Sequence, residues 1–166
     1  MIILEDTRQQ SHKHDLKHKW FEEHGIIVKR CRLYIGDYTL PTNQSVCIDT
    51  KSHLLEVVSN VTQDHERFRN EMIRAQEAGV KLIFLVEHGE GVECLEDVIF
   101  WENPRRHKRK KVDGKWVDYE TKATKGETLY NILKTMERKY GVEWQFCDKE
   151  STGRKIVELL GGDEYE

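Results

Sequence analysis

The apolar residues of this chain follow two spacings that alternate from one segment to the next. Short apolar runs rich in branched and aromatic side chains predict strands at residues 2–5, 26–29, 46–48, 81–87 and 142–146. Apolar residues at helical spacing predict helices at residues 12–24, 54–61, 64–78, 127–140 and 156–160. Such alternation is typical of an α/β domain. We therefore expect residues 1–166 to form a single domain around a central sheet.

Polar residues and glycines mark the ends of these elements. Ser11 and Asp64 stand where helix N-caps are expected, and Thr124 with Glu127 has the spacing of a capping box. The predicted helices end at glycines, namely Gly25, Gly79 and Gly141. Residues 81–87 are continuously apolar and bounded by glycines, so we expect a central strand covered on both faces.

Residues 89–123 interrupt the alternation and predict an inserted loop or hairpin. The chain has 27 Lys and Arg against 30 Asp and Glu, yet six of these cations fall between residues 105 and 111 without an acid. Such a run can neutralise phosphates, although a solvated loop is the simpler alternative. The predicted DNA-binding residues of this run are Arg105, Arg106, Lys108, Arg109, Lys110 and Lys111. Trp101, Trp116 and Tyr119 flank it and either stack on unpaired bases or anchor the insertion.

The remaining composition argues against a membrane or secreted protein. No apolar run approaches the roughly 20 residues that span a bilayer, and the amino terminus does not resemble a signal peptide. The four cysteines are widely separated and form no Cys-x-x-Cys pair, which favours free thiols in a reducing compartment. We expect a cytoplasmic protein.

Asp37, Asp49 and Lys51 form a candidate active site. Asp49 and Lys51 end an apolar strand two residues apart, so both side chains point to one face. A turn between residues 38 and 46 would return Asp49 beside Asp37 if the flanking strands pair. Carboxylates bind divalent cations that polarise a phosphate and activate water, and a lysine can stabilise the developing charge.

An acid two residues before a lysine is a weak pattern on its own. It also occurs at Asp15-x-Lys17, Asp113-x-Lys115, Glu120-x-Lys122 and Glu137-x-Lys139. The last of these lies on a predicted helix, where residues two apart diverge by about 200°. Among these sequences, only Asp49-x-Lys51 ends an apolar strand and also follows an earlier strand-like segment that ends in an acid, Asp37. The alternative for these charges is a set of surface ion pairs.

Two further points stay open at this stage. Glu5 and Asp6 are neighbours on a predicted strand, so only one of them can face the candidate site. His14 and His18 are one helical turn apart and could share a metal, but no third ligand is evident, so exposed helix side chains are the preferred interpretation.

Several motifs in order resemble the nuclease domain of the XPF family of structure-specific endonucleases, a branch of the P-D-(D/E)-x-K superfamily. The first is Asp6-Thr7-Arg8-Gln9, followed by Gly36-Asp37-Tyr38, Asp49-Thr50-Lys51 and Asp64-His65-Glu66-Arg67-Phe68. The resemblance is clear over about residues 2–88. The chain departs from the family at Gln9, Asp49, Thr50, His65 and Glu66, where the family has Glu, Glu, Arg and a single Gly between the last Asp and Arg.

The resemblance implies a restriction-endonuclease-like, three-layer α/β core with a mixed central sheet between helices. It implies that Asp37, Asp49 and the auxiliary acid Asp6 bind Mg²⁺ or Mn²⁺ and that these acids act with Lys51 in catalysis. Arg8 and Arg67 would orient or neutralise phosphate. The implied activity is metal-dependent hydrolysis of branched or junction DNA.

Other readings of the function remain open. One is a catalytically inactive DNA-binding module of the same fold. Another is an interaction protein that dimerises through the apolar stripe of residues 129–140. Family members often carry a carboxy-terminal helix-hairpin-helix domain, and we expect this chain to be a stand-alone version without it, of the size of a phage or prophage recombination nuclease. Because the family dimerises, we expect a homodimer.

Overall fold

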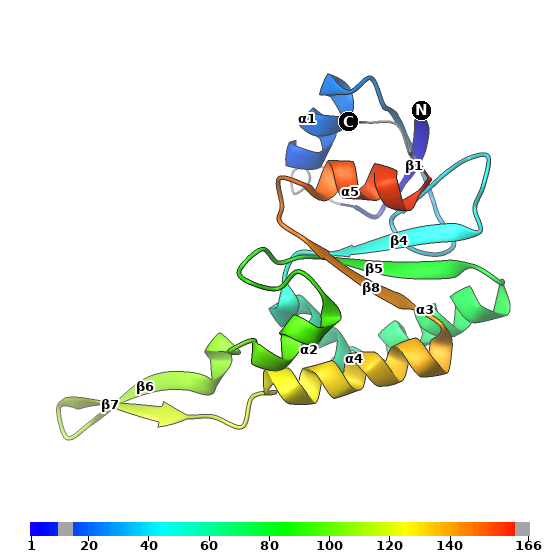
Figure 1. The fold of residues 1–166 in the computed structure, drawn as a ribbon. Coiled ribbons are helices and arrows are strands. Elements are labelled where there is room, and N and C mark those ends of the chain that lie inside the picture. The colour runs from blue at the N-terminus through cyan, green and yellow to red at the C-terminus, as the bar shows by residue number, and fades with distance from the viewer. Residues whose placement is uncertain (10–14, 162–166) are drawn as a thin grey trace.

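The computed structural model describes residues 1–9 and 15–161, and its core is a six-stranded sheet (Figure 1). The strands are β1 Ile2–Asp6, β2 Ile27–Cys31, β3 Tyr38–Thr39, β4 Val46–Lys51, β5 Lys81–Glu87 and β8 Glu143–Cys147. Their order across the sheet is β2-β1-β3-β4-β5-β8. Only β3 runs antiparallel to its two neighbours, β1 and β4, while the other pairs are parallel. The prediction of a mixed central sheet is confirmed.

Helices cover both faces of the sheet (Figure 1). They are α1 Asp15–Glu23, α2 Leu54–Thr62, α3 His65–Glu77, α4 Gly126–Tyr140 and α5 Thr152–Leu159. One apolar cluster packs α2, α3 and α4 against the sheet, and a second packs α1 and α5 against the opposite face. The three-layer architecture expected from the sequence is therefore present. Ser11, the predicted N-cap of the first helix, lies outside the described residues.

The central strand β5 shows how one sequence serves both layers. Its side chains alternate, with Leu82, Phe84 and Val86 in the first cluster and Ile83 and Leu85 in the second. All five are at most 2% exposed, which confirms a strand covered on both faces. Burying side chains of this size stabilises the fold by roughly 1.5–3 kcal/mol each. The sheet is thus a rigid support for the residues at its ends.

The capping predictions fail at α4 and hold only in part at α3. Asp64 is the N-cap residue of α3, but its side chain accepts no capping hydrogen bond. Helix α4 begins at Gly126 with Lys125 as its N-cap, so the Thr124–Glu127 capping box is wrong. Thr124 lies one residue before the N-cap, and its carbonyl accepts a hydrogen bond from the Asn103 amide at 2.8 Å. The first helical residue is a glycine because a Cβ atom there would lie 2.4 Å from the Val98 carbonyl oxygen.

The apolar stripe of α4 belongs to the core. Leu129 and Leu133 are fully buried, and Met136 and Tyr140 pack against the same cluster. This packing accounts for the pattern that also raised the possibility of a dimer interface. The stripe is therefore not a free surface.

Residues 89–123 form two short 3-10 helices and a hairpin. The elements are η2 Leu95–Phe100, η3 Pro104–Arg106, β6 His107–Val112 and β7 Lys115–Glu120. The antiparallel pair β6–β7 extends away from the sheet and helices (Figure 1). Asp113 and Gly114 join the strands with φ angles of 50° and 80°, as a tight two-residue hairpin turn requires. The Asn103 amide fixes the base by donating to the Thr124 carbonyl at 2.8 Å.

Cys31, Cys47, Cys94 and Cys147 are all free thiols. Among the described residues, no helix combines the length and apolar character that a membrane span requires.

Candidate active site

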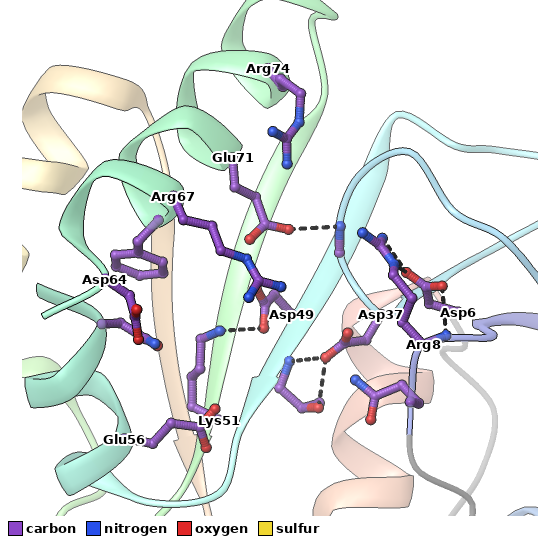
Figure 2. Close-up of a pocket in the computed structure, with 15 residues that line it drawn as sticks. Asp6, Arg8, Asp37, Asp49, Lys51, Glu56, Asp64, Arg67, Glu71 and Arg74 are labelled. Atoms are coloured by element: carbon purple, nitrogen blue, oxygen red, sulfur yellow. Dashed lines mark hydrogen bonds and ion pairs between the residues drawn. The ribbon is translucent and has the colours of Figure 1, made fainter.

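One polar pocket collects the predicted catalytic residues (Figure 2). Its floor comes from the ends of β1 and β4 and from the turn before β3, and its wall comes from α2 and α3. The lining residues include Asp6, Arg8, Gln9, Asp37, Asp49, Thr50, Lys51, Glu56, Asn60, Asp64, Arg67, Glu71 and Arg74. Segments that are far apart in the sequence thus meet at one place.

Asp49 and Lys51 lie on the same face of β4, as their spacing predicts. The Lys51 ammonium is 2.8 Å from Oδ1 of Asp49, and both side chains are less than 10% exposed. The ammonium also lies 5.4 Å and 5.6 Å from the ring centres of Phe68 and Phe84. The negative ring faces favour the cation and leave it few alternative positions. Lys51 is therefore fixed beside the carboxylate.

Asp37 reaches this pair through the short strand β3. The Asp37 amide donates to the Ile48 carbonyl at 2.7 Å, which aligns the turn with β4. The Thr50 amide and hydroxyl both donate to Oδ2 of Asp37, at 2.8 Å and 2.9 Å. Gly36 makes the approach possible, because its φ is +67° and a Cβ there would lie 2.9 Å from the Ile48 oxygen. The Gly-Asp-Tyr motif thus has a steric reason for its glycine.

The two acids resist ionisation. Removal from water raises the pKa of Asp37 and raises that of Asp49 well above its ordinary value. The nearby Asp37 carboxylate also raises the pKa of Asp49, while Lys51 lowers it. Burial alone would lower the pKa of Lys51. The negative charges of Asp49 and Asp37 outweigh this effect and raise the pKa above its ordinary value, so the lysine stays protonated. An added positive charge would therefore stabilise the ionised forms of Asp37 and Asp49.

Strand β1 separates Asp6 from Glu5. Asp6 faces the pocket, where its carboxylate accepts hydrogen bonds from the Arg8 amide at 3.0 Å and from Arg8 Nε at 2.6 Å. Burial raises the pKa of Asp6, but these bonds lower it below the ordinary value. Glu5 points to the other face, where Tyr38 Oη donates to it at 3.0 Å. The acid nearer the candidate site is therefore Asp6, and both of its oxygens are used by Arg8.

Several polar residues line the pocket without having been predicted, and three of them act on the predicted acids. Glu71 of α3 accepts a hydrogen bond from the Gly36 amide at 3.3 Å and adds negative charge that raises the pKa of Asp49. Thr50 donates to Asp37, and the Gln9 side chain helps to lower the pKa of that carboxyl. Glu71 could have been found from the sequence, because it lies one helical turn after the predicted Arg67 and therefore on the same face of the helix. The partnership of Thr50 and Gln9 with Asp37 depends on strand pairing and has no local signal.

The predicted phosphate-binding residues fall in two places. Arg8 and Arg67 line the pocket together with the acids. The basic run 105–111 instead lies at the base and along β6 of the hairpin. One contact links the two places, because Arg105 Nη1 is 3.5 Å from the Ser59 hydroxyl of α2 and the next residue, Asn60, lines the pocket.

The histidine alternative gains no support from the described residues. His18 Nε2 lies 2.5 Å from the Glu5 carboxylate, on the face of the sheet away from the pocket. His14 lies outside the part of the chain that the structure describes.

The donor set of the pocket suits a hard divalent cation. Within residues 1–9 and 15–161, no three His, Cys, Asp or Glu side chains gather closely enough to hold a metal ion between them. Mg²⁺ does not need such a cage, because it commonly uses one or two protein carboxylates and retains water and substrate oxygens. Asp37, which is partly exposed, and Asp49, which is buried, supply two carboxylates whose raised pKa values a cation would lower. The residues present therefore fit the ion that the sequence resemblance implies.

The mixed sheet between helical layers, with two acids and a lysine at the ends of adjoining strands, defines an α/β domain with the architecture of the XPF nuclease domain. The chain belongs to the ERCC4 domain family, which matches residues 6–159. Its fold is similar to that of XPF from Aeropyrum pernix, with a TM-score of 0.64, 18% identity and coverage of 96% of this chain and 63% of that one. A second structure, of XPF from Aeropyrum pernix in complex with DNA, gives a TM-score of 0.63, 19% identity and coverage of 96% and 62%.

These matches confirm the resemblance drawn from the sequence motifs. The chain spans slightly less than two thirds of the length of either solved relative. No curated protein matches the sequence.

Proposed function

We propose that this protein is a metal-dependent endonuclease that hydrolyses phosphodiester bonds in branched DNA. The observation that carries the proposal is the meeting of Asp37, Asp49 and Lys51 in one pocket with Arg8 and Arg67. A pocket with two acids of raised pKa, a buried lysine and two arginines combines groups for a cation with groups for a phosphate. Membership of the ERCC4 domain family supports the assignment to DNA.

Asp37 and Asp49 are the residues that would hold Mg²⁺ or Mn²⁺. When bound, such an ion supplies Lewis-acid polarisation of the phosphate and lowers the pKa of a coordinated water. Asp6 is the weaker candidate as a ligand, because Arg8 engages both of its oxygens. We assign Asp6 to the positioning of Arg8 at the mouth of the pocket.

The other residues have roles that follow from their charge and position. Lys51 keeps its proton beside Asp49, so it can stabilise negative charge that develops on the phosphate but is a poor general base. The carboxylates of Asp6, Glu71 and Asp37 raise the pKa of Arg8, which remains a cation. Arg8 and the exposed Arg67 would then orient the phosphates on either side of the scissile bond.

Branched DNA is the proposed substrate class because the motifs resemble those of structure-specific endonucleases. A solved relative, XPF from Aeropyrum pernix, is described in complex with DNA. A Holliday-junction resolvase and a flap or fork nuclease are the two activities that fit. Symmetric cutting of a four-way junction needs two active sites, so we also propose a homodimer, which sedimentation of the protein with and without a junction tests.

A cleavage panel tests the proposed function. End-labelled four-way junction, flap, fork and linear duplex DNA are each incubated with the protein in Mg²⁺, Mn²⁺ or EDTA. The Asp49→Asn variant is measured beside Asp15→Asn, which changes an exposed acid in another Asp-x-Lys sequence on α1. We expect cutting of branched DNA only with a metal, loss of cutting in Asp49→Asn and wild-type cutting in Asp15→Asn.

The products and failures of this panel are informative. Paired symmetric cuts in a junction identify a resolvase, and a cut beside a single-strand arm identifies a flap or fork nuclease. Binding of branched DNA without any metal-dependent cut would contradict the proposed activity and favour the inactive DNA-binding module. Neither binding nor cutting at low salt would favour an interaction protein.

A further inference from the structure

The hairpin β6–β7 has two faces of different charge. In its register Lys108 pairs with Tyr119, Lys110 with Val117 and Val112 with Lys115, and directly opposed side chains share a face. The lysine face therefore consists of Lys108, Lys110, Val112, Lys115, Val117 and Tyr119. The mixed face consists of His107, Arg109, Lys111, Trp116, Asp118 and Glu120.

Ion pairs neutralise much of the mixed face. Arg109 Nε lies 2.9 Å from Asp118 Oδ1, and Glu120 lies 3.2 Å from the Arg106 guanidinium at the hairpin base. The mixed face thus carries two carboxylates, Asp118 and Glu120, and two Arg or Lys side chains, Arg109 and Lys111, so its formal charges balance. The lysine face carries three ammonium groups and no acid. The positive field of the basic run is therefore concentrated on one side of the ribbon.

The lysine face also exposes apolar surface. Val112, Val117 and Tyr119 are 42%, 44% and 39% exposed, and the Lys110 ammonium lies 5.3 Å from the Tyr119 ring centre. Every residue of β6 and β7 is exposed, so the hairpin has no core of its own. A two-stranded ribbon of this kind is marginally stable in isolation and gains from a partner that covers one face.

We infer that the lysine face docks into the major groove of a duplex arm of the DNA substrate. The major groove is about 12 Å wide and admits a two-stranded ribbon, in which the strands are about 4.8 Å apart. Six residues of strand span about 20 Å, which matches about six base pairs along the duplex axis. The ammonium groups meet the phosphates, and the valines and Tyr119 contact base edges and sugars.

The position of the hairpin base relates this docking to the active site. Arg105 contacts Ser59 on α2, and α2 supplies Asn60 to the wall of the pocket. The base of the hairpin therefore contacts α2, a helix that also contributes to the wall of the pocket. The choice of DNA as the polyanion rests on the proposed function, whereas the choice of the face rests on the register and the ion pairs.

Two double variants with the same net charge test the inference. Lys108→Ala/Lys110→Ala removes two cations from the lysine face, and Arg109→Ala/Lys111→Ala removes two from the mixed face of the same strand. Fluorescence anisotropy in EDTA measures the affinity of the full-length protein for labelled linear duplex and single-stranded DNA over a range of salt. Thermal melting of each variant confirms that the fold is retained, because all four side chains are exposed.

We expect the lysine-face variant to lose duplex affinity by tens-fold at about 0.1 M salt and to lower the salt slope by about 1.8, since each phosphate contact contributes about 0.9. The mixed-face variant should stay close to wild type. Equal losses in the two variants, or no loss in either, would overturn the inference. A greater loss on single-stranded than on duplex DNA would overturn the assignment to a duplex groove.

The outcome is separable from that of the proposed function. Face-dependent duplex binding by a protein that never cuts DNA would remove the nuclease proposal and leave this inference intact. Metal-dependent cutting combined with unchanged duplex binding by both double variants would overturn this inference and leave the nuclease proposal intact. If wild-type protein binds no duplex while an acidic polypeptide shifts its anisotropy in a Lys108- and Lys110-dependent way, the partner is a protein and the inference is overturned.

Discussion

The Lys51 ammonium lies 2.8 Å from the Asp49 carboxylate, yet the pKa of Asp49 remains well above its ordinary value. Loss of water is the main cause, and the Asp37 and Glu71 carboxylates add to it. One lysine therefore does not neutralise the negative charge of the pocket. This residual charge is the physical reason to expect that a bound cation would stabilise the pocket and that the ionised acids cost stability in its absence.

Replacement of Asp37 by Asn should stabilise the protein in EDTA. The raised pKa of Asp37 means that the folded state binds its proton more tightly than the unfolded state, so ionisation costs stability as pH rises through the raised value. Asn keeps an oxygen that can accept from Thr50 but carries no charge. We expect Asp37→Asn to melt a few degrees above wild type at pH 8, on the order of 1 kcal/mol.

The same variant gives a pH test. The difference between Asp37→Asn and wild type should shrink as pH falls, because the wild-type carboxyl becomes protonated too. Thermal melting from pH 8 down to about pH 4, near the ordinary value of an aspartate, measures it. A variant that melts below wild type at pH 8 would show that the charge of Asp37 is not a burden on the fold.

Magnesium should stabilise the wild-type protein more at pH 8 than at pH 5. Protons compete with the cation for carboxyls whose pKa values are raised by burial. At about 100 times the dissociation constant, the expected gain is about 2.7 kcal/mol. Melting curves in MgCl₂ and in NaCl of equal ionic strength measure this gain, which Asp37→Asn should lack. An equal magnesium effect in that variant would place the ion elsewhere.

Lys51→Met should lower the rate of cleavage by about 10²- to 10³-fold while DNA binding stays near wild type. The methionine keeps the apolar stem between Phe68 and Phe84 but removes the ammonium that faces Asp49. The stated loss is typical of the removal of one group that stabilises developing charge. Single-turnover rates and anisotropy separate the two effects. A variant that cuts at the wild-type rate would exclude Lys51 from the chemistry.

Arg67→Ala and Arg69→Ala form a matched pair on α3. Both arginines are exposed, but only Arg67 lines the pocket, and residues two apart point about 200° away from each other on a helix. We expect Arg67→Ala to weaken binding of branched DNA and to lower cleavage, whereas Arg69→Ala stays near wild type. Dissociation constants at one salt concentration measure this. A similar loss in both variants would mean that Arg67 contributes only a non-specific positive charge and does not contact the DNA from the pocket.

Much of the site was predictable because strand geometry is simple. The period of two places Asp49 and Lys51 on one face of β4, and the pairing of β3 with β4 brings Asp37 beside them. The choice between Glu5 and Asp6 was not predictable, since both are buried and the answer depends on which face of β1 meets the pocket. The sequence pattern of a strand shows that Glu5 and Asp6 face opposite sides of the sheet, but it does not show which side carries the pocket.

Other features depended on contacts between distant segments. Helix α4 begins at Gly126 against the carbonyl oxygens of Val98 and Trp101, a contact between distant segments that the local capping pattern at Thr124 does not reveal. The hairpin did have a local signal, because Asp113-Gly114 between two strand-like runs is typical of a two-residue turn. Its separation into two faces followed only from the register.

The most direct test of the central claim is the single-turnover rate of branched-DNA cleavage in Mg²⁺ by wild type, Asp37→Asn and Asp15→Asn. We expect wild type and Asp15→Asn to cut at the same rate, and Asp37→Asn to lose at least about 10²-fold in rate while it still binds the DNA. Equal cutting by Asp37→Asn, or undiminished cutting in EDTA, would contradict the assignment of this pocket as a metal-dependent nuclease centre.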